Sequence, residues 1–288
     1  MKPVYLRHKE IDKLKWDNCV QNSFNHLPYC YSWYLDIVSP GWNALISSDY
    51  EFIFPLTQRR KAGINYLFQP YFTQQLGLFG KKKFNQKNDE EFLFAIPEEF
   101  KFIEINLNAE CSLNSINFKS KNKLTHHLLL NDSYENIFQQ FNQNTKRNIR
   151  KAEKSNLILK RNGDVKSLIG LFKSGVGKKT DLKLKDYKML EELMKAAVKN
   201  NCGEVYEIRN SNQNLEASLF LLSSNNILIN LFNASSYTGK KNSSMFLLFN
   251  EIIKLNSISE KLLDFEGSEI SEVAKFYKGF GSIPVFYP

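Results

Sequence analysis

The most diagnostic part of this chain is Asp264–Gly281, which reads DFEGSEISEVAKFYKGFG. An apolar run ending at Phe265 predicts a short strand, and a glycine two residues later permits the sharp turn that must follow it. Ser271–Lys278 has the spacing of an amphipathic helix, which Gly279 ends. Ile283–Tyr287 predicts a last strand, so the segment as a whole predicts strand, helix and strand.

The rest of the second half has equally regular hydrophobic patterning. A helix is expected from residue 134 to about 152, and others at 165–173, at 186–200 and, after a cap at Ser243, to about 256. Alternating apolar residues predict strands at 204–209, 215–222, 227–234 and 262–265. Helices, three strands joined by short turns, and then helix–strand–helix–strand predict an α/β domain built on a mixed sheet.

The first half repeats this order of elements in a less regular form, without a visible sequence repeat. Strands are expected at 4–7, 42–47, 51–58, 64–68, 102–107 and 126–130, and helices at 11–23, 31–38 and 89–96. A chain of 288 residues can hold two domains of ordinary size. We therefore expect one domain at 1–131 and another at 132–282, with 283–288 as a candidate addition to the first.

Composition narrows the class of protein. The formal charge is +9, which suits a partner that carries phosphates or carboxylates, or a lysine-rich solvated surface. The four cysteines lie far apart and include no Cys-x-x-Cys pair, so neither a disulfide framework nor a metal site is expected. The N-terminus lacks the apolar core of a signal peptide, and no stretch is apolar enough for a membrane span. We expect a cytoplasmic protein.

A second motif lies in the first helix of the second half, at Asn144–Lys154, which reads NTKRNIRKAEK. Together with Asp264–Gly281, and in this order along the chain, it resembles the acyl- and aminoacyltransferases of the FemAB type. The resemblance implies two tandem GNAT-like (acyl-CoA N-acyltransferase) domains. It further implies an N-acyltransferase that moves an acyl group from a thioester donor, such as acetyl-CoA, to an amine on a small molecule or peptide. The reaction would take place in a cleft between the two domains.

Two carboxylates and a phenol are the candidate catalytic groups. Asp264-Phe265-Glu266-Gly267 resembles the strand-end motif of the family, and either Asp264 or Glu266 can accept a proton from an attacking amine. The alternative for Glu266 is a helix cap or a solvated turn residue. The last helix of GNAT enzymes often supplies a proton donor, which would be Tyr277 here, with a core aromatic as the alternative.

Candidate substrate-binding residues come from three places. In the basic helix we expect Arg147 and Arg150 to face the cleft, where guanidinium groups can hold an acidic part of donor or acceptor; an ordinary solvated face is the alternative. Lys278 follows Tyr277, which stands where the tRNA-dependent relatives carry a lysine. Tyr31 and Gln74 lie in aromatic-rich stretches that suit a polar substrate or a domain interface.

The cofactor implied by the resemblance is acyl-CoA. Its diphosphate would bind backbone amides at the start of the helix after the fourth strand, and its arm would enter a notch between the fourth and fifth strands. In the second half the corresponding turn contains Gly239, Lys240 and Ser243, with only one of the expected glycines. Two other functions stay open. One is aminoacyl transfer from tRNA, which the basic charge favours and Tyr277 disfavours, and the other is a non-catalytic, ligand-binding relative.

Overall fold

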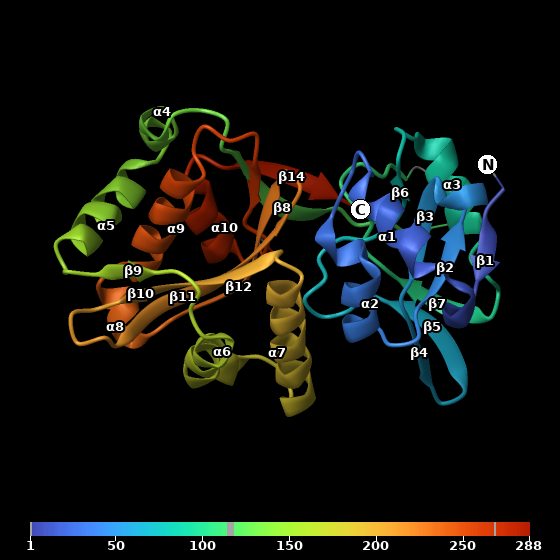
Figure 1. Ribbon diagram of the computed structural model, residues 1–288, viewed down its shortest axis with the longest axis horizontal. Coiled ribbons are helices and arrows are strands. Elements are labelled where there is room, and N and C mark those ends of the chain that lie inside the picture. The colour runs from blue at the N-terminus through green and yellow to red at the C-terminus, as the bar shows by residue number, and fades with distance from the viewer. Residues whose placement is uncertain (1, 114–117, 268) are drawn as a thin grey trace. The chain divides into compact units, whose positions relative to one another are not determined.

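The computed structural model describes residues 2–113, 118–267 and 269–288, and Ser268 of the strand-end motif lies outside them. The chain divides into two compact units (Figure 1). The first comprises residues 1–123 and 286–288, and the second comprises residues 124–285.

Within the described residues, seven strands of the second unit form one mixed sheet in the order β14-β8-β13-β12-β11-β10-β9. Strands β10, β11 and β12 form an antiparallel meander, as the turns between them predict. The strands are β8 (Lys123–Leu129), β9 (Ile158–Lys160), β10 (Gly203–Arg209), β11 (Leu215–Ser224), β12 (Ile227–Ser235), β13 (Leu262–Asp264) and β14 (Ile283–Tyr287).

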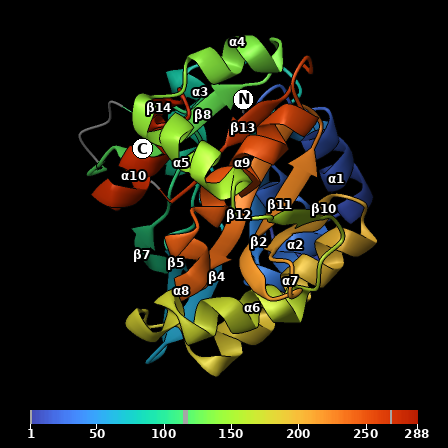
Figure 2. The same cartoon turned by 90° about the vertical axis from the view of Figure 1, so that its left-hand side faces the viewer.

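Helices cover both faces of this sheet. In Figures 1 and 2, α4, α5 and α9 lie on one side of the strands, and α6 and α7 lie on the other. The first group shares a core with β10 and β11 around Phe249, Phe265 and Phe280, all fully buried. The helices are α4 (Tyr134–Gln139), α5 (Gln143–Glu153), α6 (Val165–Ser174), α7 (Leu184–Lys199), α8 (Tyr237–Lys241), α9 (Ser244–Leu255) and α10 (Ser271–Lys278).

The helix that we expected from residue 134 to 152 is broken into α4 and α5. Asn142 causes the break, because its side chain accepts a hydrogen bond from the Thr145 amide at 2.8 Å and so caps a new helix. The backbone amide of Asn142 donates a hydrogen bond of 2.9 Å to the carbonyl of Gly279. The start of α5 is therefore attached to the end of α10.

This attachment brings the two sequence motifs together. Thr145 is 1% exposed, and a Cβ placed on Gly279 would lie 2.4 Å from its Oγ1. A Cβ on Gly281 would lie 2.9 Å from the side chain of Gln140. The glycines of the last motif are thus needed for close packing of α10 against α4 and α5. The two motifs have a structural role that spacing alone does not reveal.

Strands β12 and β13 run parallel for a short distance and then part. Their register pairs Ile227 with Leu262 and Ile229 with Asp264, and it goes no further. Beyond that point β12 continues to Ser235, whereas the chain after β13 turns away. Since side chains alone line the space between diverging parallel strands, this is a natural place for a pocket.

The first unit has two smaller sheets, of order β1-β2-β3-β6 and β4-β5-β7 among the described residues. Its core includes the buried side chains of Phe54, Leu67 and Phe92. The strands are β1 (Val4–Leu6), β2 (Asn43–Ile46), β3 (Phe52–Leu56), β4 (Gln58–Lys61), β5 (Ile64–Phe68), β6 (Phe79–Gly80) and β7 (Phe100–Glu104). The helices are α1 (Lys13–Gln21), α2 (Ser32–Val38) and α3 (Gln86–Phe94).

The two units meet along the chain at residues 123 and 124, before the expected boundary at 131. The cause is β8, which we expected as the last strand of the first domain. It pairs antiparallel with β13, Leu262 opposite Leu129 and Asp264 opposite His127, and so lies in the sheet of the second unit. Residues 286–288 are grouped with the first unit, where the carbonyl of Pro288 accepts a hydrogen bond from the Leu107 amide.

Candidate functional site

A pocket of about 460 Å³ opens in the second unit where β12 and β13 diverge. We call it the β12/β13 pocket. Its volume lies within the usual range for small-molecule sites. Its walls combine an aromatic surface with a few polar groups. The polar lining residues are Asn230, Asn233, Ser235, Lys240, Glu266 and Glu272, and the aromatic ones are Phe172, Phe232, Phe265, Phe276 and Tyr277.

Glu266 reaches the pocket through an unusual turn. Its φ is 51° and that of Gly267 is 60°, so two successive residues adopt the left-handed conformation. A residue other than glycine adopts it only when its surroundings hold it there. Here the Glu266 amide donates a hydrogen bond of 2.9 Å to Oδ1 of Asp264. The strand-end motif therefore forms a fixed turn that places Glu266 in the pocket wall.

Asp264 is buried beside this turn and is absent from the pocket lining. It is 1% exposed, and its Oδ1 also accepts a hydrogen bond from the hydroxyl of Thr125 at 2.5 Å. Its Oδ2 lies 3.3 Å from Nε2 of His127. A buried carboxylate with these partners can hold a turn in place but cannot reach a ligand. Sequence reasoning did not connect Thr125 and His127 with the site, because the pairing of β8 with β13 brings them there.

Tyr277 lies in the pocket wall with only 4% of its surface exposed. Its hydroxyl accepts hydrogen bonds from the side-chain amides of Asn230 at 3.1 Å and Asn233 at 3.4 Å. Burial raises the pKa of Tyr277 well above its ordinary value, and the nearby Glu266 carboxylate adds to the effect. The phenol therefore stays protonated at neutral pH and can donate a hydrogen bond.

Asn230 and Asn233 are site residues that sequence reasoning missed. Both lie in β12, and Asn230 also donates a hydrogen bond of 3.0 Å to the carbonyl of Phe265. This side-chain bond joins β12 to the end of β13 just where their backbone pairing stops. The sequence feature that could have identified them is the presence of two asparagines in an otherwise apolar strand, because polar side chains in the interior of a protein are normally hydrogen-bonded.

The three cations predicted to bind substrate lie outside the described pocket lining. Arg147 and Arg150 are exposed on α5, and Arg147 donates a hydrogen bond of 2.8 Å to the Asn144 side chain one turn earlier. Lys278 is exposed on α10, next to the buried Tyr277. The geometry thus groups Tyr277 with Glu266 and leaves these three cations on the surface.

The predicted diphosphate turn is closed. Gly239 is buried, its amide is bonded to the Ser236 hydroxyl at 2.9 Å, and a Cβ on it would lie 2.0 Å from the Glu216 carbonyl oxygen. Ser243, which we expected to cap α9 with its side chain, has a φ of 61° and donates its hydroxyl to Asn148 instead. Lys240 is exposed and lies at the pocket edge.

A buried carboxylate also lies at the start of α9. Glu216 is 1% exposed and accepts hydrogen bonds from Asn242 at 3.0 and 3.1 Å and from the Ser244 hydroxyl at 2.6 Å. Asn210 donates a further bond of 3.2 Å. A helix start attracts anions, and here one of the protein's own side chains supplies the negative charge. The residues present therefore do not form the open amide cradle that a coenzyme A diphosphate requires.

Tyr31 and Gln74 belong to the first unit. The Tyr31 hydroxyl donates to the side chain of Gln21, and its ring stacks on Trp33 with centroids 6.4 Å apart. Gln74 accepts a hydrogen bond of 2.8 Å from the Gln75 side chain. Their predicted role in substrate binding stays a prediction.

Two further searches concern the described residues only. No group of three or more His, Cys, Asp or Glu side chains among them is arranged to hold a metal ion. None of the helices in this part of the chain has both the length and the apolar character needed to cross a bilayer.

Comparison with known proteins shows the fold. No protein-family model matches the chain, and no curated protein matches its sequence. Among solved structures, FemX superposes with a TM-score of 0.70 at 11% identity, covering 100% of this chain and 97% of FemX. The L-PGS of Bacillus licheniformis gives 0.58 at 9% identity, covering 96% and 90%. The C-terminal domain of a putative lysylphosphatidylglycerol synthetase from Agrobacterium fabrum gives 0.57 at 9%, covering 96% and 89%.

These similarities extend over nearly the whole chain, so they concern the folds of both units and are not limited to one motif. The chain has the two-domain, GNAT-like α/β fold of FemAB-type proteins. Because a fold supports many chemistries, the function has to be argued from the pocket.

Proposed function

We propose that the chain is an N-acyltransferase that holds the acyl group of its donor in the β12/β13 pocket and transfers it to an amine. The observation that supports this proposal is a pocket of small-molecule size whose wall contains a carboxylate, from Glu266, and a protonated phenol, from Tyr277. The aromatic walls suit an acyl chain, and the polar groups are gathered at the diverging strand ends.

Glu266 would act as the general base. The amine nitrogen forms a bond to the acyl carbon and passes its proton to the Glu266 carboxylate, while the bond from the acyl carbon to the sulfur or oxygen of the donor breaks. The leaving atom then takes up a proton. Because Asp264 fixes the turn at Glu266, the backbone that carries the carboxylate is already in place in the pocket wall.

Tyr277 would donate a hydrogen bond rather than act as a base. Its oxygen already accepts bonds from Asn230 and Asn233, which leaves its hydrogen for the acyl oxygen as negative charge develops there. The raised pKa keeps that hydrogen in place at neutral pH. In this scheme Asp264 is a positioning residue for Glu266.

The donor would be held by its acyl end. The closed turn at Gly239 and the buried carboxylate of Glu216 offer no site for a diphosphate, so no step depends on coenzyme A. Short thioesters, such as acyl-pantetheines, are therefore suitable donors for a first screen.

The test is acyl transfer from a panel of acyl-pantetheines to amines and peptides, followed by mass spectrometry. We expect product with the wild type and loss of product with Val273→Trp, which fills the pocket. Val198→Trp, on the exposed side of α7, is the control and should retain activity. Product that forms equally with both variants would contradict the proposal, provided that thermal melts show both to be folded.

A second candidate is transfer of an aminoacyl group from tRNA. Two observations favour it: the pocket contains two carboxylates, Glu266 and Glu272, that would attract the ammonium of an aminoacyl group, and exposed lysines occur on the elements at the pocket edge. Lys240 lines the pocket, and the short helix Val176–Lys179 contributes Val176 to it. Other exposed lysines on these elements include Lys173, Lys178, Lys179 and Lys241.

Filter binding of charged tRNA over a salt series distinguishes the candidates. If tRNA binds there, affinity should fall steeply with salt, and Lys178→Gln/Lys179→Gln should reduce the slope of log affinity against log salt by about 2. Lys160→Gln/Lys254→Gln removes the same charge elsewhere and should change the slope less. Equal slopes in the two variants would argue against this candidate.

A further inference from the structure

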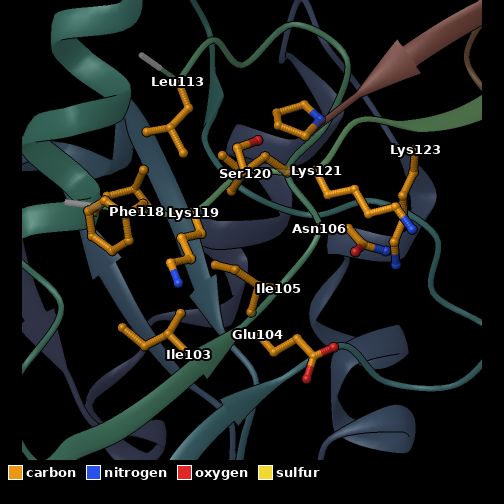
Figure 3. Close-up of a pocket in the computed structure, with 13 residues that line it drawn as sticks. Ile103, Glu104, Ile105, Asn106, Leu113, Phe118, Lys119, Ser120, Lys121 and Lys123 are labelled. Atoms are coloured by element: carbon orange, nitrogen blue, oxygen red, sulfur yellow. The ribbon is translucent and has the colours of Figure 1, made fainter. Parts of the chain in front are cut away.

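A second cavity is lined only by residues of the first unit, and it shares no residue with the β12/β13 pocket. Its volume is about 240 Å³ (Figure 3). For comparison, a cavity of about 150 Å³ is enough to bind benzene. The residues that line it come from α3, from the end of β7 and the chain after it, from the stretch 118–123 and from the last residue, Pro288.

The base of this cavity is apolar and continuous with the core of the unit. Leu93 and Leu107 are each 4% exposed and belong to that core. Ile103, Ile105 and Phe118 are half-buried and pack against it. Any ligand that enters would thus cover apolar surface that is now partly open to water.

One side of the same cavity is cationic. Lys119, Lys121 and Lys123 occupy alternate positions of the chain and all three line the cavity. In Figure 3, Lys121 and Lys123 extend toward Asn106, and Lys119 extends toward the space between Phe118 and Ile103. Asn106 is held in place because its side-chain amide donates a hydrogen bond of 2.8 Å to the Gln74 carbonyl.

These lysines have no acidic partner among the residues that the structure describes. The ion pairs found there join other residues, such as Lys82 with Glu51. Glu104 is the acidic side chain in the described lining, and it forms no ion pair with the three lysines. Lys121 and Lys123 extend toward the same side chain without a counter-ion, so their charges repel each other, and an anion between them would remove that cost.

We propose that this cavity binds a small amphiphilic anion, in which an alkyl or aryl group ends in a carboxylate or phosphate. The apolar part would lie on Ile103, Ile105 and Phe118, and the anionic head would be bound by Lys121 and Lys123 beside Asn106. A cation is disfavoured by the lysines, and a fully polar anion leaves the apolar base uncovered. This site goes beyond the proposed transfer reaction, because it lies in the first unit and uses none of the same residues.

The test is calorimetric titration of the full chain with ethyl, butyl and hexyl phosphate. Because each buried methylene contributes about 0.8 kcal/mol, affinity should rise about threefold to fourfold per methylene until the cavity is full. Inorganic phosphate and hexylammonium should bind much more weakly than hexyl phosphate. Affinity that does not change with chain length, or equal binding of hexylammonium, would overturn the proposal.

Matched variants locate the head group. Lys121→Gln/Lys123→Gln should weaken hexyl phosphate binding at least about tenfold, because two charge-assisted hydrogen bonds are lost. Lys61→Gln/Lys101→Gln removes the same charge from exposed positions of β4 and β7 outside the cavity and should leave the affinity within about twofold. If both pairs weaken binding equally, the effect is one of net charge and the site is wrong. The measurement reads binding alone, so a failed transfer assay would not affect it.

Discussion

Strand β12 lines the β12/β13 pocket and leads into residues 236–244, which we call the α8–α9 turn; the pocket is open and the turn is filled. The pocket has Glu266 and Tyr277 in its wall. In the α8–α9 turn, the Gly239 amide donates a hydrogen bond to the Ser236 hydroxyl. The Glu216 carboxylate accepts hydrogen bonds from Asn242 and Ser244. The difference teaches that, beside the same strand, the fold can keep one pocket open while the polar groups at the neighbouring helix start are bonded internally.

The largest effect is expected from a substitution of Glu266 in the open pocket. If it is the base, Glu266→Gln should lower kcat by about 10²- to 10⁴-fold with little change in KM, because proton transfer is lost while the shape of the pocket is kept. Steady-state kinetics with the best donor from the screen measure this. Glu272→Gln, in the same lining, is the matched control, and an equal loss in both variants would assign the effect to pocket charge.

The filled turn can be tested through its packing. Gly239→Ala should destabilise the protein by about 3 kcal/mol, because the new Cβ would lie 2.0 Å from the Glu216 carbonyl oxygen. Gly170→Ala, on the exposed side of α6 with nothing within 4 Å, should be neutral or stabilising by up to about 1 kcal/mol. Denaturant unfolding of the two variants gives both values. A tolerated alanine at 239 would mean that the turn opens readily.

A smaller effect is expected at Tyr277. Tyr277→Phe removes one hydrogen-bond donor and should lower kcat about threefold to tenfold. The raised pKa predicts that this ratio stays constant from about pH 7 to about pH 10, because the phenol remains protonated throughout.

The same pKa shift has a consequence for stability. Above about pH 10 the unfolded phenol ionises before the folded one, so the wild type should lose stability there as pH rises. The Tyr277→Phe variant should lose less. Chemical unfolding at several alkaline pH values checks the sign, and equal losses would contradict the burial of an ionisable group.

The smallest difference is expected between two donors. Acetyl-CoA and acetyl-pantetheine should bind with affinities within about threefold of each other, because the closed turn gives the diphosphate no fixed partners. Competition binding measures the ratio. Acetyl-CoA that binds a hundredfold more tightly would show that the diphosphate is held after all.

Much of the second unit followed from its sequence. The helix Ser271–Lys278 and the strand Ile283–Tyr287 begin and end at the predicted residues, because turn residues and strong periodicity mark both. The break between α4 and α5 was missed, since the hydrophobic face continues across it. The break depends on Asn142, whose backbone amide donates a hydrogen bond to the carbonyl of Gly279, a residue distant in the sequence.

The candidate site could be predicted only in part. Glu266 and Tyr277 were candidates because they lie in the strand-end motif and the last helix that resemble the family, and one pocket contains both. The environment of Asp264 was not predictable, because Thr125 and His127 reach it only through the pairing of β8 with β13. The closure of the α8–α9 turn was equally hidden, since the partners of Glu216 come from two separate segments, at Asn210 and at residues 242–244.

The buried carboxylate of Glu216 has a practical consequence for anyone who wishes to redesign this protein. A nucleotide-binding turn could not be installed by adding glycines alone, because an incoming phosphate would meet a resident negative charge at the beginning of α9. That internal anion would first have to be made neutral, and Asn210, Asn242 and Ser244 given new partners, before the helix could hold an external one.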